Sequence, residues 1–301
     1  MQTDPRRPFG RLLTAMVTPF DADLALDLDR AAELATYLVD EMANDALVIN
    51  GTTGEAPTTS PEEKAELVAA VVAAVGDRAQ VIAGIGAFDT AHTVKLAEQA
   101  AGAGAHGLLV VTPYYSKPPQ RGLLAHFRAV ADATDLPVML YDIPKRTGTP
   151  IETSTLLELA EHERIVAVKD AKADIVGSGQ VIAISAERGT PLAYYSGEDA
   201  LTLPLLSVGA VGLVGTSTHF TGLLAKEIIT AYEAGDVARA LRVHRLAEPL
   251  FTGIFATQGC MLVKAGLALR GRPVGGLRLP LVPASEDETA ALAARLAEVG
   301  L

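Results

Sequence analysis

The chain has 301 residues, of which 49% are hydrophobic and 20% charged, and this composition excludes a largely disordered chain. Its 25 basic and 36 acidic residues give a net charge of −11 without any basic run, which argues against binding to nucleic acid or an anionic membrane. Cys260 is the single cysteine, so no intrachain disulfide can form. The longest apolar run, residues 67–75, is about half a membrane span, and the apolar stretch at 12–17 is too short for a secretory signal. We therefore expect a cytoplasmic protein.

Short runs rich in Val, Ile and Leu alternate with longer helical patterns along the chain. Most of these runs are continuously apolar, which is typical of parallel strands covered on both faces. A helix is predicted over 30–41, and another begins with Ser60 as N-cap, Pro61 in the first turn and Glu63 closing a capping box. The predicted strands are 14–20, 46–50, 80–85, 107–112, 137–143, 165–170, 192–196 and 211–215.

Eight such units of roughly 28 residues predict a (β/α)8 TIM barrel. A doubly wound parallel sheet would show the same alternation, and the strand count by itself leaves that alternative open. After residue 236 the strand signals stop, and 237–255, 260–270 and 286–299 are predicted to be three appended helices. We therefore expect a catalytic barrel domain over 1–236 and a C-terminal helical extension over 237–301.

Several familiar motifs are absent or lie in the wrong context. Residues 102–107 match the spacing G-x-G-x-x-G, but a helix precedes them and a strand follows, the reverse of a dinucleotide-binding fingerprint. These glycines are therefore expected to form a turn. The six histidines are scattered and form no cluster with cysteine, so we expect no metal site.

Lys169 carries the strongest chemical signal, because catalytic groups of a barrel come from the carboxyl ends of its strands. A lysine inside the apolar run 165–170 must point into the barrel or be paired. Desolvation lowers the pKa of such an amine and produces the neutral form that attacks a ketone. The alternative is a structural lysine paired with Asp170 or another inward carboxylate.

Other polar residues also follow predicted strands. Tyr141, Tyr115, Thr52 and Thr53 could relay a proton near Lys169, although either tyrosine alone could be a core aromatic.

The loop 51–54, Gly-Thr-Thr-Gly, suits a small anion because its flanking glycines let backbone amides and hydroxyls approach closely. Its alternative is an ordinary turn between strand and helix. Arg146 suits bidentate recognition of a carboxylate, and its alternative is a surface arginine.

These residues resemble the dihydrodipicolinate synthase and N-acetylneuraminate lyase family of pyruvate-dependent class I aldolases, over essentially the whole chain. Residues 109–120, LVVTPYYSKPPQ, and 168–174, VKDAKAD, are most similar to its actinobacterial synthases. Thr52-Thr53 and Arg146 favour the synthases over the sialic-acid lyases, which usually carry Ser-Thr and lack that arginine.

The resemblance implies that Lys169 forms a Schiff base with pyruvate, so that no separate cofactor or metal is needed. Tyr141 would act as general acid and base through a relay with Thr52 and Tyr115. In this family the tyrosine matching Tyr115 comes from the neighbouring subunit, and a homotetramer built as a dimer of dimers is the common form.

The resemblance also assigns substrate-binding positions. Gly51 and Thr53 would hold the pyruvate carboxylate, and Arg146 would bind that of L-aspartate 4-semialdehyde. Gly197 and the backbone carbonyl of Val214 would line the pocket. One departure lies just after Val214, where residues 215–217 read Gly-Thr-Ser and the family usually has serine followed by valine.

The activity implied is condensation of pyruvate with L-aspartate 4-semialdehyde to 4-hydroxy-tetrahydrodipicolinate, the first committed step of diaminopimelate and lysine biosynthesis. One alternative is another pyruvate-dependent aldolase acting on a 2-keto-3-deoxy sugar acid. Another is a catalytically silent barrel that acts as a binding or regulatory subunit, against which Lys169 and the two tyrosines argue.

Feedback by lysine is not expected. Lysine-inhibited members of the family bind the effector at the dimer interface through polar residues, of which only Tyr114 is kept here. A glutamate that would meet the effector's ammonium group is replaced by His92, and Lys64 adds a like charge. The replaced positions are Ala56, Pro57, Pro61, Lys64, Phe88 and His92.

Overall fold

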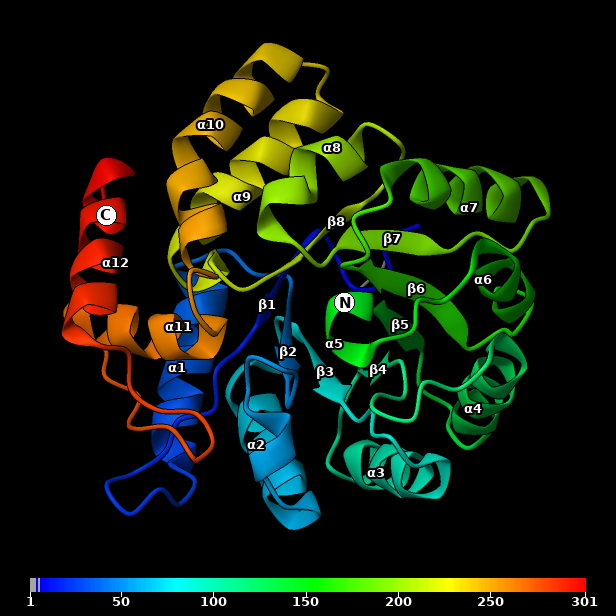
Figure 1. The fold of residues 1–301 in the computed structure, drawn as a ribbon, viewed down its shortest axis with the longest axis horizontal. Coiled ribbons are helices and arrows are strands. Elements are labelled where there is room, and N and C mark those ends of the chain that lie inside the picture. The colour runs from blue at the N-terminus through cyan, green and yellow to red at the C-terminus, as the bar shows by residue number, and fades with distance from the viewer. Residues whose placement is uncertain (1–3, 5) are drawn as a thin grey trace.

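A computed structural model describes residue 4 and residues 6–301, and it shows eight parallel strands closed into a barrel (Figure 1). Each strand pairs with the next in the chain, and the first pairs with the last, which confirms the predicted barrel and excludes the doubly wound sheet. The strands are β1 Leu12–Ala15, β2 Ala46–Ile49, β3 Gln80–Gly84, β4 Gly107–Val111, β5 Val138–Asp142, β6 Ile165–Asp170, β7 Ala193–Ser196 and β8 Gly212–Gly215.

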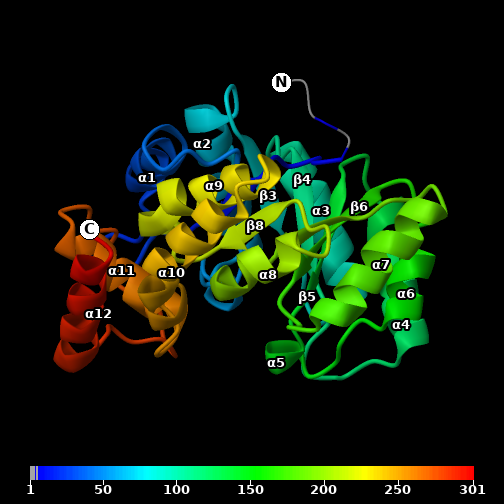
Figure 2. The ribbon, with the colours of Figure 1, turned by 90° about the horizontal axis from the view of Figure 1, so that it is seen from above.

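Helices surround the barrel, and three more follow the last barrel helix, as predicted. Figure 2 shows the extension, α10 to α12, gathered at one side of the molecule beside α1 and α9, with α4, α6 and α7 at the opposite side and α5 at the lower edge of the view. The barrel helices are α1 Leu28–Asp40, α2 Pro61–Val75, α3 Thr90–Gly102, α4 Gln120–Asp132, α5 Pro144–Thr147, α6 Thr153–Leu159, α7 Ile175–Glu187, α8 Thr202–Leu206 and α9 Thr218–Glu233. The extension comprises α10 Val237–Gly253, α11 Gly259–Leu269 and α12 Glu286–Glu298, and two short 3-10 turns are η1 Ala56–Thr58 and η2 Asp199–Leu201.

The two faces of each strand pack in different places. Side chains such as Leu140 and Val168 point outward and pack against the surrounding helices. Met139, Ala167 and Val214 belong to a separate cluster that fills the barrel interior. Both faces are therefore apolar, which accounts for the unbroken hydrophobic runs in the sequence.

The first strand differs most from its prediction. It spans Leu12–Ala15 rather than 14–20, because Leu12 pairs with Leu213 of β8 and closes the barrel. Phe20 has already left the barrel, and its backbone N–H donates to the carbonyl of Val274 at 3.1 Å. Both partners lie about 200 or more residues away in sequence, so no local pattern could reveal them.

Two local predictions are confirmed. Ser60 and Glu63 form the reciprocal capping box, with the Glu63 N–H 3.2 Å from the Ser60 hydroxyl oxygen and the Ser60 N–H 2.8 Å from a Glu63 carboxylate oxygen. The glycines at 102–107 form the turn between α3 and β4, where Gly104 has φ +87°. None of the helices in the described ranges is long and apolar enough to cross a membrane.

A buried ion pair joins the C-terminal extension to the barrel. The ammonium of Lys264, on α11, lies 2.7 Å from a carboxylate oxygen of Glu55, and the two side chains are 3% and 0% exposed. Arg278, from the segment between α11 and α12, donates its backbone N–H to the other Glu55 oxygen at 3.0 Å. Glu55 directly follows the loop 51–54, so the extension holds one end of that loop. The division of the chain at residue 236 stays a prediction.

We predict that Lys264→Met lowers the free energy of unfolding by about 3–5 kcal/mol, because it leaves the Glu55 carboxylate buried without a counter-charge. Urea denaturation measures this change. Adding Glu55→Gln to Lys264→Met should restore part of the loss, since no buried charge then remains. Arg30→Met, which breaks the exposed Arg30–Glu33 pair, is the control and should cost less than about 1 kcal/mol. Equal loss in the single and double variants would contradict this account.

Candidate active site

A cavity of about 350 Å³ opens at the carboxyl ends of the strands, around Lys169. Side chains from β5, β6 and the loops after β2, β7 and β8 line it together with the start of α11. The structure therefore brings together most of the predicted site residues, namely Thr52, Thr53, Tyr141, Arg146, Lys169 and Gly197.

Lys169 points into the barrel and is only 5% exposed. Its register partner on β5 is Tyr141, and its Nζ atom lies 4.3 Å from the centroid of the tyrosine ring. Burial lowers the pKa of Lys169 to about 8, although the negative charges of Asp199 and Glu198 oppose the shift. At pH 7 about one molecule in ten then carries the neutral amine, against about one in three thousand for an ordinary lysine.

Pairing between Lys169 and Asp170, the alternative raised above, is excluded by strand alternation. Asp170 points to the outer face of β6, where its carboxylate accepts hydrogen bonds from the Ser178 hydroxyl and, at 2.8 Å, from the backbone N–H of Lys172. Lys169 forms no ion pair with any residue that the structure describes. Its amine therefore remains free to face the cavity.

The Tyr141 hydroxyl is protonated at neutral pH. Burial raises the pKa of Tyr141 well above its usual value, while the charge of Arg146 and the side chain of Thr52 lower it in part. A phenol beside a neutral amine can donate a proton and take it back, which suits an acid–base group. The side chains that favour its ionised form come from α5 and from the loop after β2.

The loop 51–54 is an ordinary turn in its backbone, with the N–H of Gly54 bonded to the carbonyl of Gly51 at 3.0 Å. Its polar side chains nevertheless face the cavity. The hydroxyl oxygen of Thr53 lies 3.3 Å from that of Thr216. Thr18 donates to the Gly54 carbonyl at 2.6 Å and fixes the far end of the loop.

The departure at residues 215–217 has a structural reason. The carboxylate of Asp199 is fully buried and accepts the backbone N–H of Thr216 at 3.1 Å and that of Ser217 at 2.9 Å. A Cβ atom on Gly215 would lie 2.9 Å from a carboxylate oxygen of Asp199 and 2.5 Å from Thr218. Gly215 therefore makes room for the carboxylate that holds Thr216 at the cavity.

Arg146 lies on α5 at the cavity mouth, where its NH2 group donates to the Oε1 atom of Gln258 at 2.8 Å. The cavity-lining residues that were not predicted include Thr216, Glu198 and Gln258. Glu198 directly follows the predicted residue Gly197. Its position at the carboxyl end of β7 was a sequence signal that could have identified it. Gln258 comes from the C-terminal extension, and no sequence pattern indicated it.

A second cavity, of about 340 Å³, continues from the first and is lined mainly by apolar residues. Gly51 lies here with Thr52, Tyr141 and Arg146. Val214 is buried in the barrel interior and lines neither cavity. Tyr115 also lines neither, since it is 94% exposed on the surface, with φ +73°.

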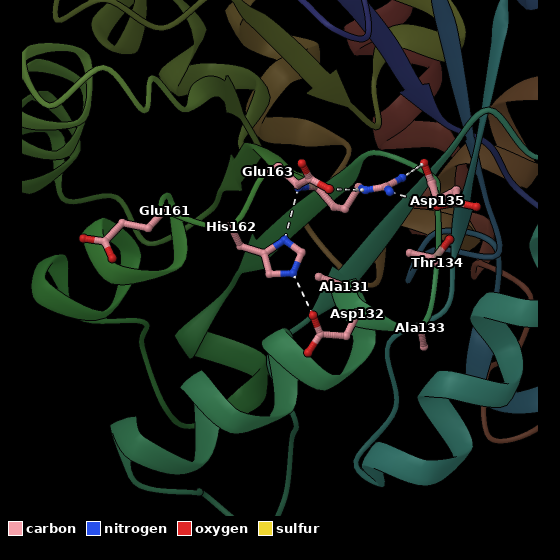
Figure 3. A pocket seen from close by; sticks show the side chains of 9 residues that line it. Ala131, Asp132, Ala133, Thr134, Asp135, Glu161, His162 and Glu163 are labelled. Carbon is pink, nitrogen blue, oxygen red and sulfur yellow. Dashed lines mark hydrogen bonds and ion pairs between the residues drawn. The ribbon is translucent and has the colours of Figure 1, made fainter.

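A third hollow, of about 620 Å³, lies at the opposite end of the barrel, in the loops before β5 and β6 (Figure 3). Several of its charged or titratable groups are paired: His162 lies 3.1 Å from Asp132, and Arg164 lies 2.8 Å from Asp135. It has no part in the chemistry around Lys169. The described residues contain no group of three or more His, Cys, Asp or Glu side chains that could hold a metal ion.

The fold and this site define the class: a (β/α)8 barrel with a desolvated lysine at the carboxyl end of its strands. The model of the Dihydrodipicolinate synthetase family matches residues 8–299, and the chain belongs to this family.

Individual relatives agree with the family match. The chain is 63% identical over 293 residues to the 4-hydroxy-tetrahydrodipicolinate synthase of Acidothermus cellulolyticus, covering 97% of this chain and 93% of that protein. It is 64% identical over 272 residues to the synthase of Cutibacterium acnes, covering 90% and 91%. A crystal structure of DHDPS from Cyanidioschyzon merolae with lysine bound superposes with a TM-score of 0.93 at 39% identity, covering 98% and 99%. Both the fold and the site therefore lie within a well-populated family.

We predict that Lys169 reacts with a small amine-directed reagent, such as acetic anhydride, at a lower pH than an ordinary lysine. Because burial lowers its pKa to about 8, the reactive neutral amine should accumulate as the pH rises through about 8 and level off above it. Mass spectrometry of the peptide containing Lys169 measures this profile. A yield that continues to rise steeply between about pH 9 and 11 would contradict the lowered pKa.

Proposed function

We propose that the chain condenses pyruvate with L-aspartate 4-semialdehyde through an imine on Lys169. Its activity is the pyruvate-dependent condensation of diaminopimelate and lysine biosynthesis, as in the synthases with which it shares more than half of its sequence. The observation that carries the mechanism is the buried amine of Lys169 beside the Tyr141 ring, in a cavity that also holds two threonines and an arginine.

The imine forms by ordinary amine chemistry. The lone pair of the neutral Lys169 amine attacks the keto carbon of pyruvate, and the resulting carbinolamine loses water to give the imine. The Tyr141 hydroxyl donates the proton that the departing water needs and takes back one from the amine. Thr53 and Gly51, in the loop 51–54, bind the pyruvate carboxylate.

Loss of a proton from the methyl carbon of the imine then gives an enamine, whose terminal carbon attacks the aldehyde of the second substrate. Tyr141 and Thr52 form this chain's part of the relay, and Tyr115 of a neighbouring subunit completes it. Arg146 binds the carboxylate of the semialdehyde by charge-assisted hydrogen bonds. The amino group of the semialdehyde then attacks the imine carbon and displaces the Lys169 amine, which closes the ring and releases the product, so the cycle needs neither metal nor other cofactor.

An aldolase acting on a 2-keto-3-deoxy sugar acid is not favoured, since relatives at 63% and 64% identity carry the name of the synthase. We further propose that the protein works in the cytoplasm as a homotetramer built from two dimers. The exposed Tyr115, held away from its own cavity, supports a subunit contact at that point.

Incubation with pyruvate and borohydride should add one pyruvate-derived mass to the peptide containing Lys169, because reduction traps the imine. Peptide mass spectrometry locates the label, and a coupled assay with a panel of aldehydes identifies the acceptor. Lys169→Ala is the control and should take up no label. A label on another residue, or one that persists in Lys169→Ala, would disprove the proposed mechanism.

Tyr115 is expected to act in the neighbouring subunit's site. Tyr115→Phe and Lys169→Ala should each have little activity alone, whereas mixing them should recover part of it, because a mixed dimer contains one intact site. Turnover after subunit exchange, with the exchange followed by native mass spectrometry, measures the recovery. If the mixtures stay inactive after subunits have exchanged, Tyr115 acts in the active site of its own chain.

We also propose that lysine does not regulate this enzyme, and the region where the family's effector is expected supports this. The ammonium of Lys64 donates to the Ala56 carbonyl and to the Thr59 hydroxyl, each at 2.9 Å, and so occupies polar groups that an effector's ammonium would need. Phe88 packs edge-on against Tyr114, with ring centroids 5.7 Å apart.

Turnover at saturating pyruvate should therefore stay constant as lysine is raised into the millimolar range. His92 stands where a glutamate would meet the ammonium group of the effector, and the positive charge of Lys64 repels that group. Assays of the coupling enzymes alone under the same lysine concentrations provide the control. Saturable inhibition would show that the interface binds lysine by other contacts.

A further inference from the structure

Gln258 lies at the start of α11, where its backbone carbonyl accepts from the Met261 N–H at 2.9 Å but its side chain makes no capping bond. It occupies the N-cap position, yet its side chain accepts no hydrogen bond from the first helical turn. Instead its Oε1 atom accepts a hydrogen bond from Arg146 at 2.8 Å, joining residues 112 positions apart in sequence. The Gln258 side chain therefore makes no capping bond in its own helix and instead contacts Arg146, the residue proposed to bind the acceptor carboxylate. This contact gives it a candidate role in the site.

The position of Gln258 within the cavities points the same way. It lines the cavity around Lys169 and also the apolar cavity beside it, as do Thr52, Tyr141 and Arg146. The Arg146–Gln258 contact therefore lies where the two cavities meet. A second substrate that enters to meet an imine on Lys169 must fit beside this contact.

The chemistry of the contact suits an arginine that must bind a carboxylate. Arg146 is exposed on a helix of only four residues, so little else restricts its long side chain. The amide oxygen of Gln258 fixes one NH2 group and leaves the remaining N–H donors and the full positive charge available. A carboxylate in the same place would form an ion pair with the guanidinium and compete with a substrate carboxylate for it.

We infer that Gln258 is a positioning residue that orients Arg146 for the carboxylate of the acceptor aldehyde. This inference rests on the proposed function and adds a specificity role for the C-terminal extension. Fixing the guanidinium before the substrate arrives reduces the entropy lost on binding. This smaller entropy loss strengthens binding of the acceptor alone, because pyruvate binds through Lys169 and the loop 51–54.

Steady-state kinetics with each substrate varied in turn test the inference. Gln258→Ala should raise KM for the semialdehyde by about 3- to 10-fold, with KM for pyruvate and borohydride labelling of Lys169 as in the wild type. Gln258→Glu should raise KM for the semialdehyde further, because the new carboxylate forms an ion pair with the Arg146 guanidinium and competes with the substrate carboxylate. Thr257→Ala, at the neighbouring position and outside both cavities, is the matched control and should behave as the wild type.

A double-mutant cycle separates positioning from a general structural effect. In an Arg146→Ala background, Gln258→Ala should cause no further rise in KM for the semialdehyde, because its partner is gone. Equal effects with and without Arg146, or an unchanged KM in Gln258→Ala, would overturn the inference while leaving the proposed function intact. A wild-type enzyme that fails to use the semialdehyde at all would overturn both.

Discussion

Desolvation of one amine is the constraint on which the rest of the site depends. Lys169 has a nucleophilic amine near neutral pH only because the closed barrel excludes water from it. The same closure raises the pKa of Tyr141, so that a protonated phenol stands beside a partly neutral amine. An open sheet would leave Lys169 hydrated and charged. Barrel closure through β1 and β8 is therefore a chemical requirement as well as an architectural one.

Strand alternation sorts the polar residues of β5 and β6 into two sets. Tyr141 and Lys169 point inward, whereas Asp142 and Asp170, one residue further along each strand, point outward. A shift of one residue in either strand would exchange a catalytic side chain for a carboxylate. The outward carboxylates bind backbone N–H groups and the Ser178 hydroxyl, and so help hold the strand ends in register.

The C-terminal extension is part of the site and not an attachment to it. Through Lys264 it pairs with Glu55 at the end of the loop proposed to hold pyruvate, and through Gln258 it contacts Arg146, the proposed ligand of the acceptor carboxylate. Two separate contacts from one helix thus reach both proposed substrate positions. If Gln258 positions Arg146 as inferred above, changes in the extension alter acceptor specificity without changing the barrel.

The sequence by itself determined the succession of strands and helices along the chain and most of the residues that line the candidate site. Continuous apolar runs identify buried parallel strands, a capping box marks a helix start, and a lysine in an apolar strand is a local anomaly that needs no structure to notice. The tertiary structure alone decided that the sheet closes and that Gln258 meets Arg146. Each of these depends on residues far apart in the chain, and hydrophobic periodicity carries no information about which distant partners meet.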